Sequence, residues 1–204
     1  MMKDSMQRVE VDARGLECPK PVIFTRKALE EHTGAMITTV VDSEIARDNV
    51  LKFCRSQGME AVVTERSGTW YIDIFKKSME SGMDPMLERA PDFLDMVVLV
   101  GSNQFGVGER ELGDILIKGY FYTLTESKPY PKAVLFVNSG AYLTLEDSSV
   151  LEYIRTLESE GVQILTCGTC LDYYHIKDKL AAGGVTNMYT IVEMMNGARN
   201  TVRI

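Results

Sequence analysis

The fold of the N-terminal part is decided by the stretch Val11-Asp12-Ala13-Arg14-Gly15-Leu16-Glu17-Cys18-Pro19-Lys20-Pro21. Its first residues continue an alternation of apolar and polar side chains from Val9, which predicts a half-buried strand at 9–12. Proline fits the first turn of a helix because its missing N–H has no intrahelical acceptor there and its fixed φ suits a helix start. We therefore expect a strand, a short loop, and a helix that begins at the Cys-Pro-Lys-Pro segment.

The residues after this helix continue with strand and helix patterns. Residues 36–41 are rich in β-branched side chains and predict a strand, and Ser43 is a suitable N-cap for a second helix. Two further strands are expected at 59–65 and 70–75. The order βαβαββ predicts a two-layer α/β sandwich over residues 7–77.

The C-terminal part, residues 93–204, has the pattern of an open parallel sheet. It opens with a nearly continuous apolar run at 93–100, which is typical of a parallel strand buried on both faces. Alternating strands and helices predict βαβ units and a doubly wound sheet. We expect strands at 93–100, 133–137, 162–166, 185–189 and 201–204, and helices at 109–124, 148–160, 175–182 and 191–196. The charged, proline-containing residues 78–92 predict a linker between the two domains.

The composition excludes several classes of partner and ligand. The formal net charge of −7 argues against nucleic acid or an acidic membrane, because binding phosphates needs a concentrated basic surface. No apolar run reaches the roughly 18 residues of a transmembrane helix, and residues 1–8 are too polar for a signal peptide. The loop at 101–108 lacks the spacing of a dinucleotide-binding motif. We expect a cytoplasmic protein with no nucleic-acid partner, no membrane partner and no cofactor.

Cys18 stands where a helix is expected to begin. A cysteine at the N-cap faces free backbone N–H groups and the positive end of the helix dipole, and both stabilise a thiolate. Pro19 and Pro21 make this geometry rigid. Arg14 and Lys20 add positive charge nearby, and the acidic residues Asp12 and Glu17 partly offset it. An exposed, activated thiol suits group transfer, in which it accepts a sulfur atom as a persulfide and passes it on. The alternative is a buried or incidental cysteine at a helix start.

A second thiol site is predicted at Cys167-Gly168-Thr169-Cys170, where the strand at 162–166 ends. Open α/β sheets place their ligands at the carboxyl ends of the strands. A Cys-x-x-Cys pair there can be a redox dithiol, a sulfur acceptor with a resolving partner, or half of a metal site. The alternative is a pair of structural cysteines with no chemical role. A zinc site needs two more ligands, and His175 is the only histidine nearby, so we expect thiol chemistry and no metal. Cys54 lies on the apolar stripe of its helix, which predicts core packing.

The N-terminal motif resembles the signature of the TusA/SirA family of small sulfur-carrier proteins. The likeness rests on residues 11–21, and the βαβαββ order over residues 7–77 agrees with the fold of that family. The resemblance implies that Cys18 carries a persulfide. It also implies a supporting role for the other residues of the motif, Arg14, Gly15, Pro19, Lys20 and Pro21.

Residues 93–204 are similar to the DsrE-like family, whose members take part in sulfur transfer and often form trimers or hexamers. A reactive cysteine can lie after the third strand in that family, and Cys167 matches this position best. The tandem of the two domains resembles the YedF family, which is associated with selenium metabolism. The resemblance implies a homo-oligomer formed through the DsrE-like domain. Nothing in these residues distinguishes sulfur from selenium.

Together these observations predict a sulfur or selenium carrier with two thiol sites. Cys18 accepts the atom from a cysteine desulfurase-like donor and passes it to Cys167 or Cys170, or to a separate acceptor protein. This is sulfurtransferase-like chemistry in a transfer protein, more than an enzyme with free turnover. Two alternatives stay open at this point. One is an interaction module whose cysteines sense redox state, and the other is a metal-binding protein built on the Cys-x-x-Cys pair.

Overall fold

The computed structural model describes residues 7–75 and 93–204, which belong to two compact units. The first unit is Met1–Pro85 and the second unit is Met86–Ile204. Each unit has its own sheet and its own hydrophobic core. The predicted linker at 78–92 lies outside the described residues.

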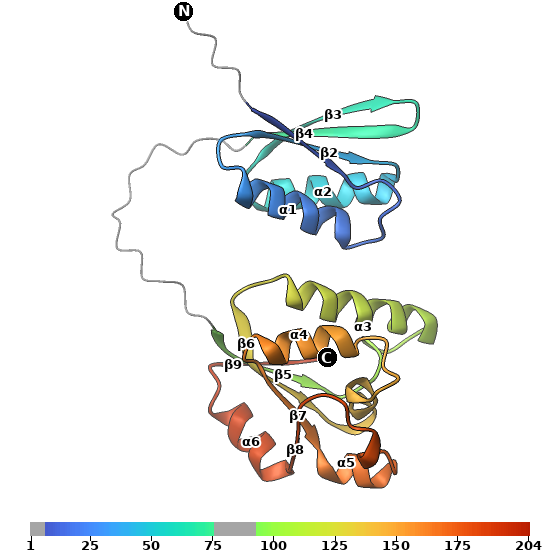
Figure 1. Cartoon of the computed structure of the whole chain (residues 1–204), viewed down its shortest axis with the longest axis vertical. Coiled ribbons are helices and arrows are strands. Elements are labelled where there is room, and N and C mark those ends of the chain that lie inside the picture. The colour runs from blue at the N-terminus through green and yellow to red at the C-terminus, as the bar shows by residue number, and fades with distance from the viewer. Residues whose placement is uncertain (1–6, 76–92) are drawn as a thin grey trace, which may run out of the picture. The chain divides into compact units, whose positions relative to one another are not determined.

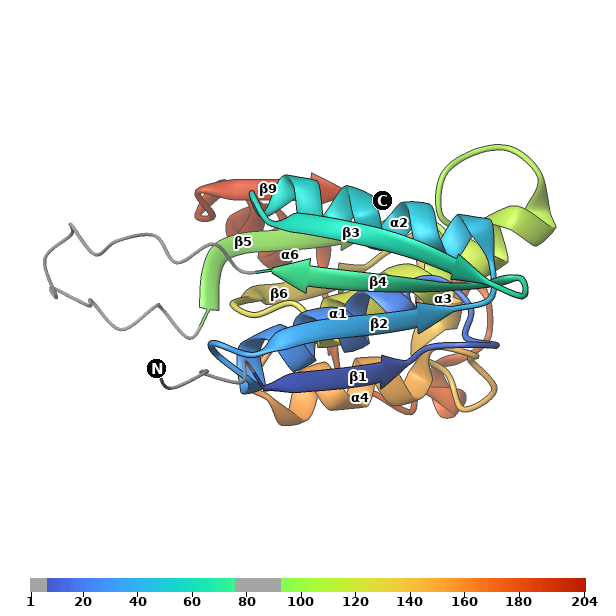
Figure 2. The ribbon, with the colours of Figure 1, turned by 90° about the horizontal axis from the view of Figure 1, so that it is seen from above.

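The first unit is a four-stranded sheet with two helices on one face (Figure 1). Its elements are β1 (Arg8–Asp12), α1 (Lys20–Glu31), β2 (Met36–Val41), α2 (Glu44–Ser56), β3 (Glu60–Arg66) and β4 (Thr69–Phe75). The strands lie in the order β1-β2-β4-β3, with β1 parallel to β2 and the other pairs antiparallel (Figure 2). This confirms the predicted βαβαββ two-layer sandwich.

The core of the first unit lies between the sheet and the two helices. Ile72 and Ile74 of β4 are fully buried there, and they belong to the same apolar cluster as Cys54 of α2. Ser43 caps α2 as predicted, because its side chain accepts the N–H of Ala46 over 3.5 Å. Packing and capping together fix α2 against the sheet.

The second unit is built on a five-stranded, all-parallel sheet in the order β8-β7-β6-β5-β9. Its strands are β5 (Phe93–Val100), β6 (Tyr130–Phe136), β7 (Gln163–Cys167), β8 (Gly184–Thr186) and β9 (Asn200–Arg203). Its helices are α3 (Arg110–Thr125), α4 (Leu151–Ser159), α5 (Gly168–Tyr173) and α6 (Met188–Asn196), with 3-10 segments η1 (Asn138–Thr144) and η2 (Lys177–Lys179).

Helices cover both faces of this sheet (Figure 1). Val98 of β5 packs in the apolar cluster formed with α3 and α4, while its neighbour Val97 packs in the cluster formed with α6. Both side chains are fully buried, as expected for a central parallel strand. The predicted doubly wound parallel sheet is therefore confirmed.

One predicted helix of the second unit is wrong. The sequence places a helix at 175–182, whereas the chain turns into α5 directly after β7 and stops at Tyr173. His175 then adopts φ +55, which no α-helix can contain, and only the short 3-10 segment η2 follows. The structure also adds η1, which the sequence did not predict. Across residues 7–75 and 93–204, no helix combines the length and the hydrophobicity needed to cross a bilayer.

Candidate functional site

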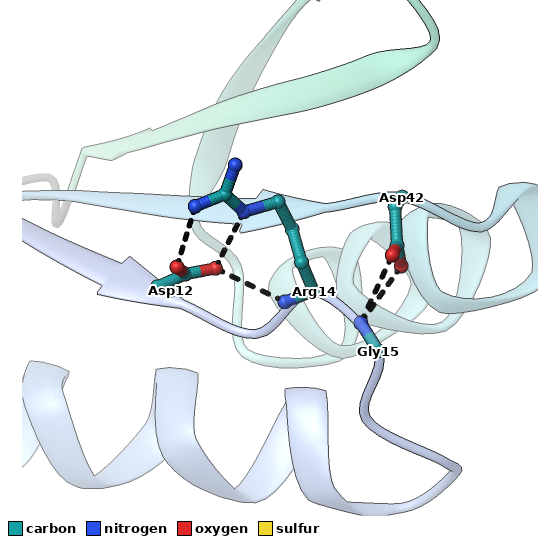
Figure 3. A network of polar contacts seen from close by, with 4 residues as sticks. All are labelled: Asp12, Arg14, Gly15 and Asp42. Atoms are coloured by element: carbon teal, nitrogen blue, oxygen red, sulfur yellow. Dashed lines mark hydrogen bonds and ion pairs between the residues drawn. The ribbon is translucent and has the colours of Figure 1, made fainter.

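The loop between β1 and α1 is fastened to the carboxyl end of β2. The N–H of Ala13 donates to the carbonyl of Val40 over 2.8 Å, which continues the parallel pairing past β1. The N–H of Gly15 then donates to both carboxylate oxygens of Asp42, at 3.0 Å each (Figure 3). Gly15 has φ +67, a conformation that glycine adopts at no steric cost. Asp42 thus fixes the direction in which the loop leaves the sheet toward Cys18.

Arg14 folds back onto the end of β1. Its Nε and Nη2 atoms lie 2.9 and 2.7 Å from the two carboxylate oxygens of Asp12, and its backbone N–H also donates to that carboxylate (Figure 3). The side-chain hydrogen bonds, followed by the backbone bond, lower the pKa of Asp12 to about 2. The sequence predicts that Asp12 offsets part of the positive charge of Arg14, and in the structure the two side chains form an ion pair.

Cys18 is exposed on the same loop, immediately before α1. The predicted N-cap position of Cys18 is wrong by one residue, because the N-cap is Pro19. The expected free N–H groups are also missing from the first two helical positions: the N–H of Lys20 donates to the carbonyl of Glu17 over 3.0 Å, and Pro21 has no N–H. A hydrogen bond to the sulfur of Cys18 must therefore come from a donor other than these two N–H groups.

That donor comes from the neighbouring helix. The side-chain amide of Asn49, on α2, donates to the Sγ of Cys18 over 3.7 Å, although the two residues are 31 positions apart. Val50 and Cys54 of α2 are buried in the core, which holds the helix and its Asn49 in place. An N–H aimed at a sulfur favours the charged form of that sulfur. Cys18 is thus an exposed thiol with one positioned hydrogen-bond donor.

The second candidate site lies at the start of α5 in the second unit. Cys167 ends β7 and is buried, with 2% of its surface exposed, whereas Cys170 is partly exposed. Both are free thiols. Burial raises the pKa of Cys170, and a hydrogen bond from the Asn138 N–H opposes this rise, while the neighbouring Cys167 side chain adds to it. The Cys170 thiol therefore stays mostly protonated at neutral pH.

Asn138 contacts the sulfur of Cys170. It follows the end of β6 after one intervening residue, opens η1, and has φ +51. Its backbone N–H donates to the Sγ of Cys170 over 3.0 Å. Its side-chain oxygen accepts the hydroxyl of Tyr174 over 2.6 Å, and the Tyr174 ring lies 4.9 Å from the ring of Tyr142. The carboxyl ends of two neighbouring strands, β6 and β7, thus meet around one sulfur atom.

Comparisons with known proteins concern the first unit most directly. Residues 9–77 match the protein-family model described as sulfurtransferase TusA. The chain is 33% identical over 69 residues to a putative sulfur carrier protein of Methanocaldococcus jannaschii, with 33% of this chain and 92% of that protein covered. It is 32% identical over 79 residues to the sulfur carrier protein TusA of Pseudomonas entomophila, with 38% and 99% covered. The chain belongs to the TusA family.

The chain is also similar over part of its length to solved structures. A SirA-like protein of Desulfitobacterium hafniense is 34% identical, with a TM-score of 0.31 and with 32% of this chain and 92% of that chain covered. The ychN protein of E. coli is 12% identical, with a TM-score of 0.42 and with 55% and 100% covered.

Three residues of the two sites were missed by the sequence analysis. The sequence carried a signal for Asp42, because this residue directly follows β2, the strand that pairs in parallel with β1 of the first unit. The sequence signal for Asn138 was weaker. This asparagine stands before Ser-Gly at the end of a predicted strand, and asparagine tolerates the left-handed backbone conformation that turns there require. The sequence carried no signal for Asn49, because its contact with Cys18 depends on how α2 packs beside α1.

The remaining candidates fall outside both sites. Cys54 is buried in the core of the first unit, with 1% of its surface exposed, which confirms its predicted packing role. Burial also raises the pKa of its thiol. His175 is exposed on the turn that follows α5. Within the parts of the chain that the structure describes, no three His, Cys, Asp or Glu side chains gather in a group able to hold a metal ion.

Proposed function

We propose that this protein carries sulfur as a persulfide on Cys18. The observation that supports this most is the position of Cys18: it is exposed, it lies inside the segment that matches the TusA family, and its sulfur accepts a hydrogen bond from Asn49. The two relatives described above are named a putative sulfur carrier protein and a sulfur carrier protein. Asp42 and Gly15 hold the loop that presents the thiol.

The transfer chemistry is a thiol exchange. In the proposed step, the Cys18 thiolate attacks the outer sulfur of a persulfide on a cysteine desulfurase-like donor. A bond forms between that sulfur and the Sγ of Cys18, and the bond to the donor cysteine breaks, so the donor leaves as a thiolate. No electrons are gained or lost overall. Arg14, Gly15, Pro19, Lys20 and Pro21 support the step by shaping the loop and the start of α1.

We extend the proposal to an acceptor and to the element carried. The Cys167–Cys170 pair is a candidate acceptor within the same chain, and a separate acceptor protein is the other route. The likeness of the tandem to DsrE-like and YedF proteins supports selenium as a second cargo, because selenium and sulfur can occupy a cysteine in the same way. A homo-oligomer formed through the second unit and a cytoplasmic location complete the proposal, and light scattering on the full chain tests the oligomer.

Intact-mass analysis tests the carrier role. The reduced full-length protein is incubated with a cysteine desulfurase and either cysteine or selenocysteine, and the gain of one reductant-labile sulfur or selenium atom is mapped by peptide analysis. We expect the atom on Cys18 in the wild type and no loading in Cys18→Ser, whereas Cys54→Ala, a matched change of a buried thiol, loads normally. A Cys18→Ser variant that loads at the wild-type rate excludes this role.

A further inference from the structure

The thiols of the second unit differ sharply in access to solvent. Cys167 is 2% exposed at the end of β7, whereas Cys170 is partly exposed in the first turn of α5. The two side chains lie in the same region of the core, since Cys170 packs against the apolar cluster that contains Cys167. An incoming molecule therefore meets the sulfur of Cys170 first, with Cys167 directly behind it.

The residues that surround the sulfur of Cys170 come from separate parts of the chain. The Asn138 N–H points at the Cys170 sulfur from the end of β6, and the Tyr174 hydroxyl holds the Asn138 side chain. Gly140 keeps this turn against the sheet, because a Cβ there would lie 2.4 Å from the carbonyl oxygen of Val100. A backbone N–H fixed in this way stabilises negative charge on the atom it faces.

We propose that the second unit releases sulfide from a persulfide, with Cys170 as the accepting thiol and Cys167 as the resolving thiol. In the first step Cys170 loses its proton to solvent, and its thiolate attacks the outer sulfur of an incoming persulfide. A new S–S bond forms, the old one breaks, and the donor leaves as a thiolate. This assignment places acceptance on Cys170, where the sequence favoured Cys167.

In the second step the Cys167 thiol gives its proton to the outer sulfur of the Cys170 persulfide, and the resulting thiolate attacks the Sγ of that persulfide. The Cys167–Cys170 disulfide forms and the outer sulfur leaves as hydrosulfide, so two thiols are oxidised while one sulfane sulfur is reduced. The Asn138 N–H faces the Sγ of Cys170. At this atom the bond to the outer sulfur breaks and the bond to Cys167 forms. A dithiol reductant restores the pair for another cycle. The same steps apply to a selenosulfide, which releases hydroselenide. The supply of the persulfide by Cys18 rests on the proposed function, but the chemistry at Cys170 does not.

A single-turnover experiment separates the two ideas. The full-length Cys18→Ser protein, fully reduced, is mixed with glutathione persulfide, and sulfide and intact mass are followed. We expect about one sulfide per chain and the loss of two hydrogens, mapped to a Cys167–Cys170 disulfide. Because Cys18 is absent from this protein, a negative result here leaves the carrier role of Cys18 intact. A failure of desulfurase loading likewise leaves this result intact.

Variants of the pair define the direction of the reaction. In the Cys18→Ser background, Cys167→Ser should release no sulfide and retain one extra sulfur on Cys170, and Cys170→Ser should neither release sulfide nor gain sulfur. The triple variant without Cys18, Cys167 and Cys170 gives the background decay of the reagent. Sulfur trapped on Cys167 in the Cys170→Ser variant overturns the assignment, as does sulfide release without Cys167.

The role of Asn138 is tested by two changes that keep its backbone in place and one that displaces it. Asn138→Gly keeps the N–H and the left-handed conformation and removes only the bond to Tyr174, so the rate of sulfide release should fall by less than about threefold, and Tyr174→Phe should match it. Gly140→Ala displaces the turn that carries the N–H, and we expect a loss of about tenfold or more. Equal rates in Gly140→Ala and Asn138→Gly would remove Asn138 from the mechanism. Circular dichroism checks that each variant is folded.

Discussion

The side-chain amide of Asn49 lies 3.7 Å from the Sγ of Cys18 and donates a hydrogen bond to it from a different helix. Replacing Asn49 with leucine removes this hydrogen bond from the sulfur of Cys18. Since the bond is long and the thiol is exposed, we expect alkylation of Cys18 by iodoacetamide at pH 7 to slow by only about threefold. The measurement is the alkylation rate of Cys18 at pH 7, followed by peptide mass analysis.

Asn49→Gln is the matched control for this prediction, because it keeps an amide donor on a longer side chain. It should recover part of the lost rate at pH 7. An alkylation rate in Asn49→Gln no higher than in Asn49→Leu would mean that the hydrogen bond is not the cause. That result would remove Asn49 from the carrier site.

The four cysteines should react with iodoacetamide in a fixed order. Cys18 is exposed and should react first, and Cys170 should follow slowly because burial raises its pKa and keeps it mostly protonated at neutral pH. The Cys170 rate should therefore continue to rise above about pH 9. Cys54 and Cys167 are buried and should react only after unfolding. Peptide mass analysis at timed intervals gives the order, and labelling of Cys167 before Cys170 would contradict the arrangement at α5.

Most of the architecture could be predicted because its signals are long and local. The apolar run that became β5 marks a strand buried on both faces, and the Ser43 N-cap marks the start of α2. The helix α5 could not be predicted, because it has only six residues and no side-chain cap. Two turns of hydrophobic periodicity are needed to identify a helix from sequence, and α5 is too short to provide them.

The candidate sites could be predicted in part for the same reason. Cys18 and the Cys167–Cys170 pair stand in motifs, and their chemistry follows from residue type and spacing. The hydrogen-bond partners of these cysteines do not follow from residue type or spacing. Asn49 reaches Cys18 through the packing of two helices, and Asn138 reaches Cys170 through the register of two parallel strands. Such contacts exist only after the chain has folded, so no local pattern contains them.

The Asp12–Arg14 pair should make stability depend on pH in the acid range. The pKa of Asp12 is about 2 in the folded protein and about 3.9 in an unfolded chain. A lowered carboxyl pKa contributes stability above the unfolded value, and this contribution is lost as pH falls toward the folded value. We expect Asp12→Asn to unfold at a lower urea concentration than the wild type at pH 7, with the difference shrinking between about pH 4 and about pH 2.

Trp70 makes this measurement specific to the first unit, because it is the only tryptophan in the chain and lies in β4. The control is a double-mutant cycle with Arg14→Gln. If the pair is the cause, Asp12→Asn should have little effect in the Arg14→Gln background. A difference between the wild type and Asp12→Asn that persists undiminished at pH 2 would show that the effect has another origin.

Two glycines of the second unit should respond in opposite ways to alanine. A Cβ at Gly140 would lie 2.4 Å from the carbonyl oxygen of Val100, so the backbone must move, and we expect a loss of about 2 kcal/mol in the free energy of unfolding. Gly119 lies inside α3, where a Cβ would point into open space, and alanine there should stabilise the helix by up to about 1 kcal/mol. Urea unfolding followed by far-UV circular dichroism compares the two, and Trp70 fluorescence should change in neither variant. Equal stabilities for Gly140→Ala and Gly119→Ala would mean that the turn carrying Asn138 is not held against β5 as the structure shows.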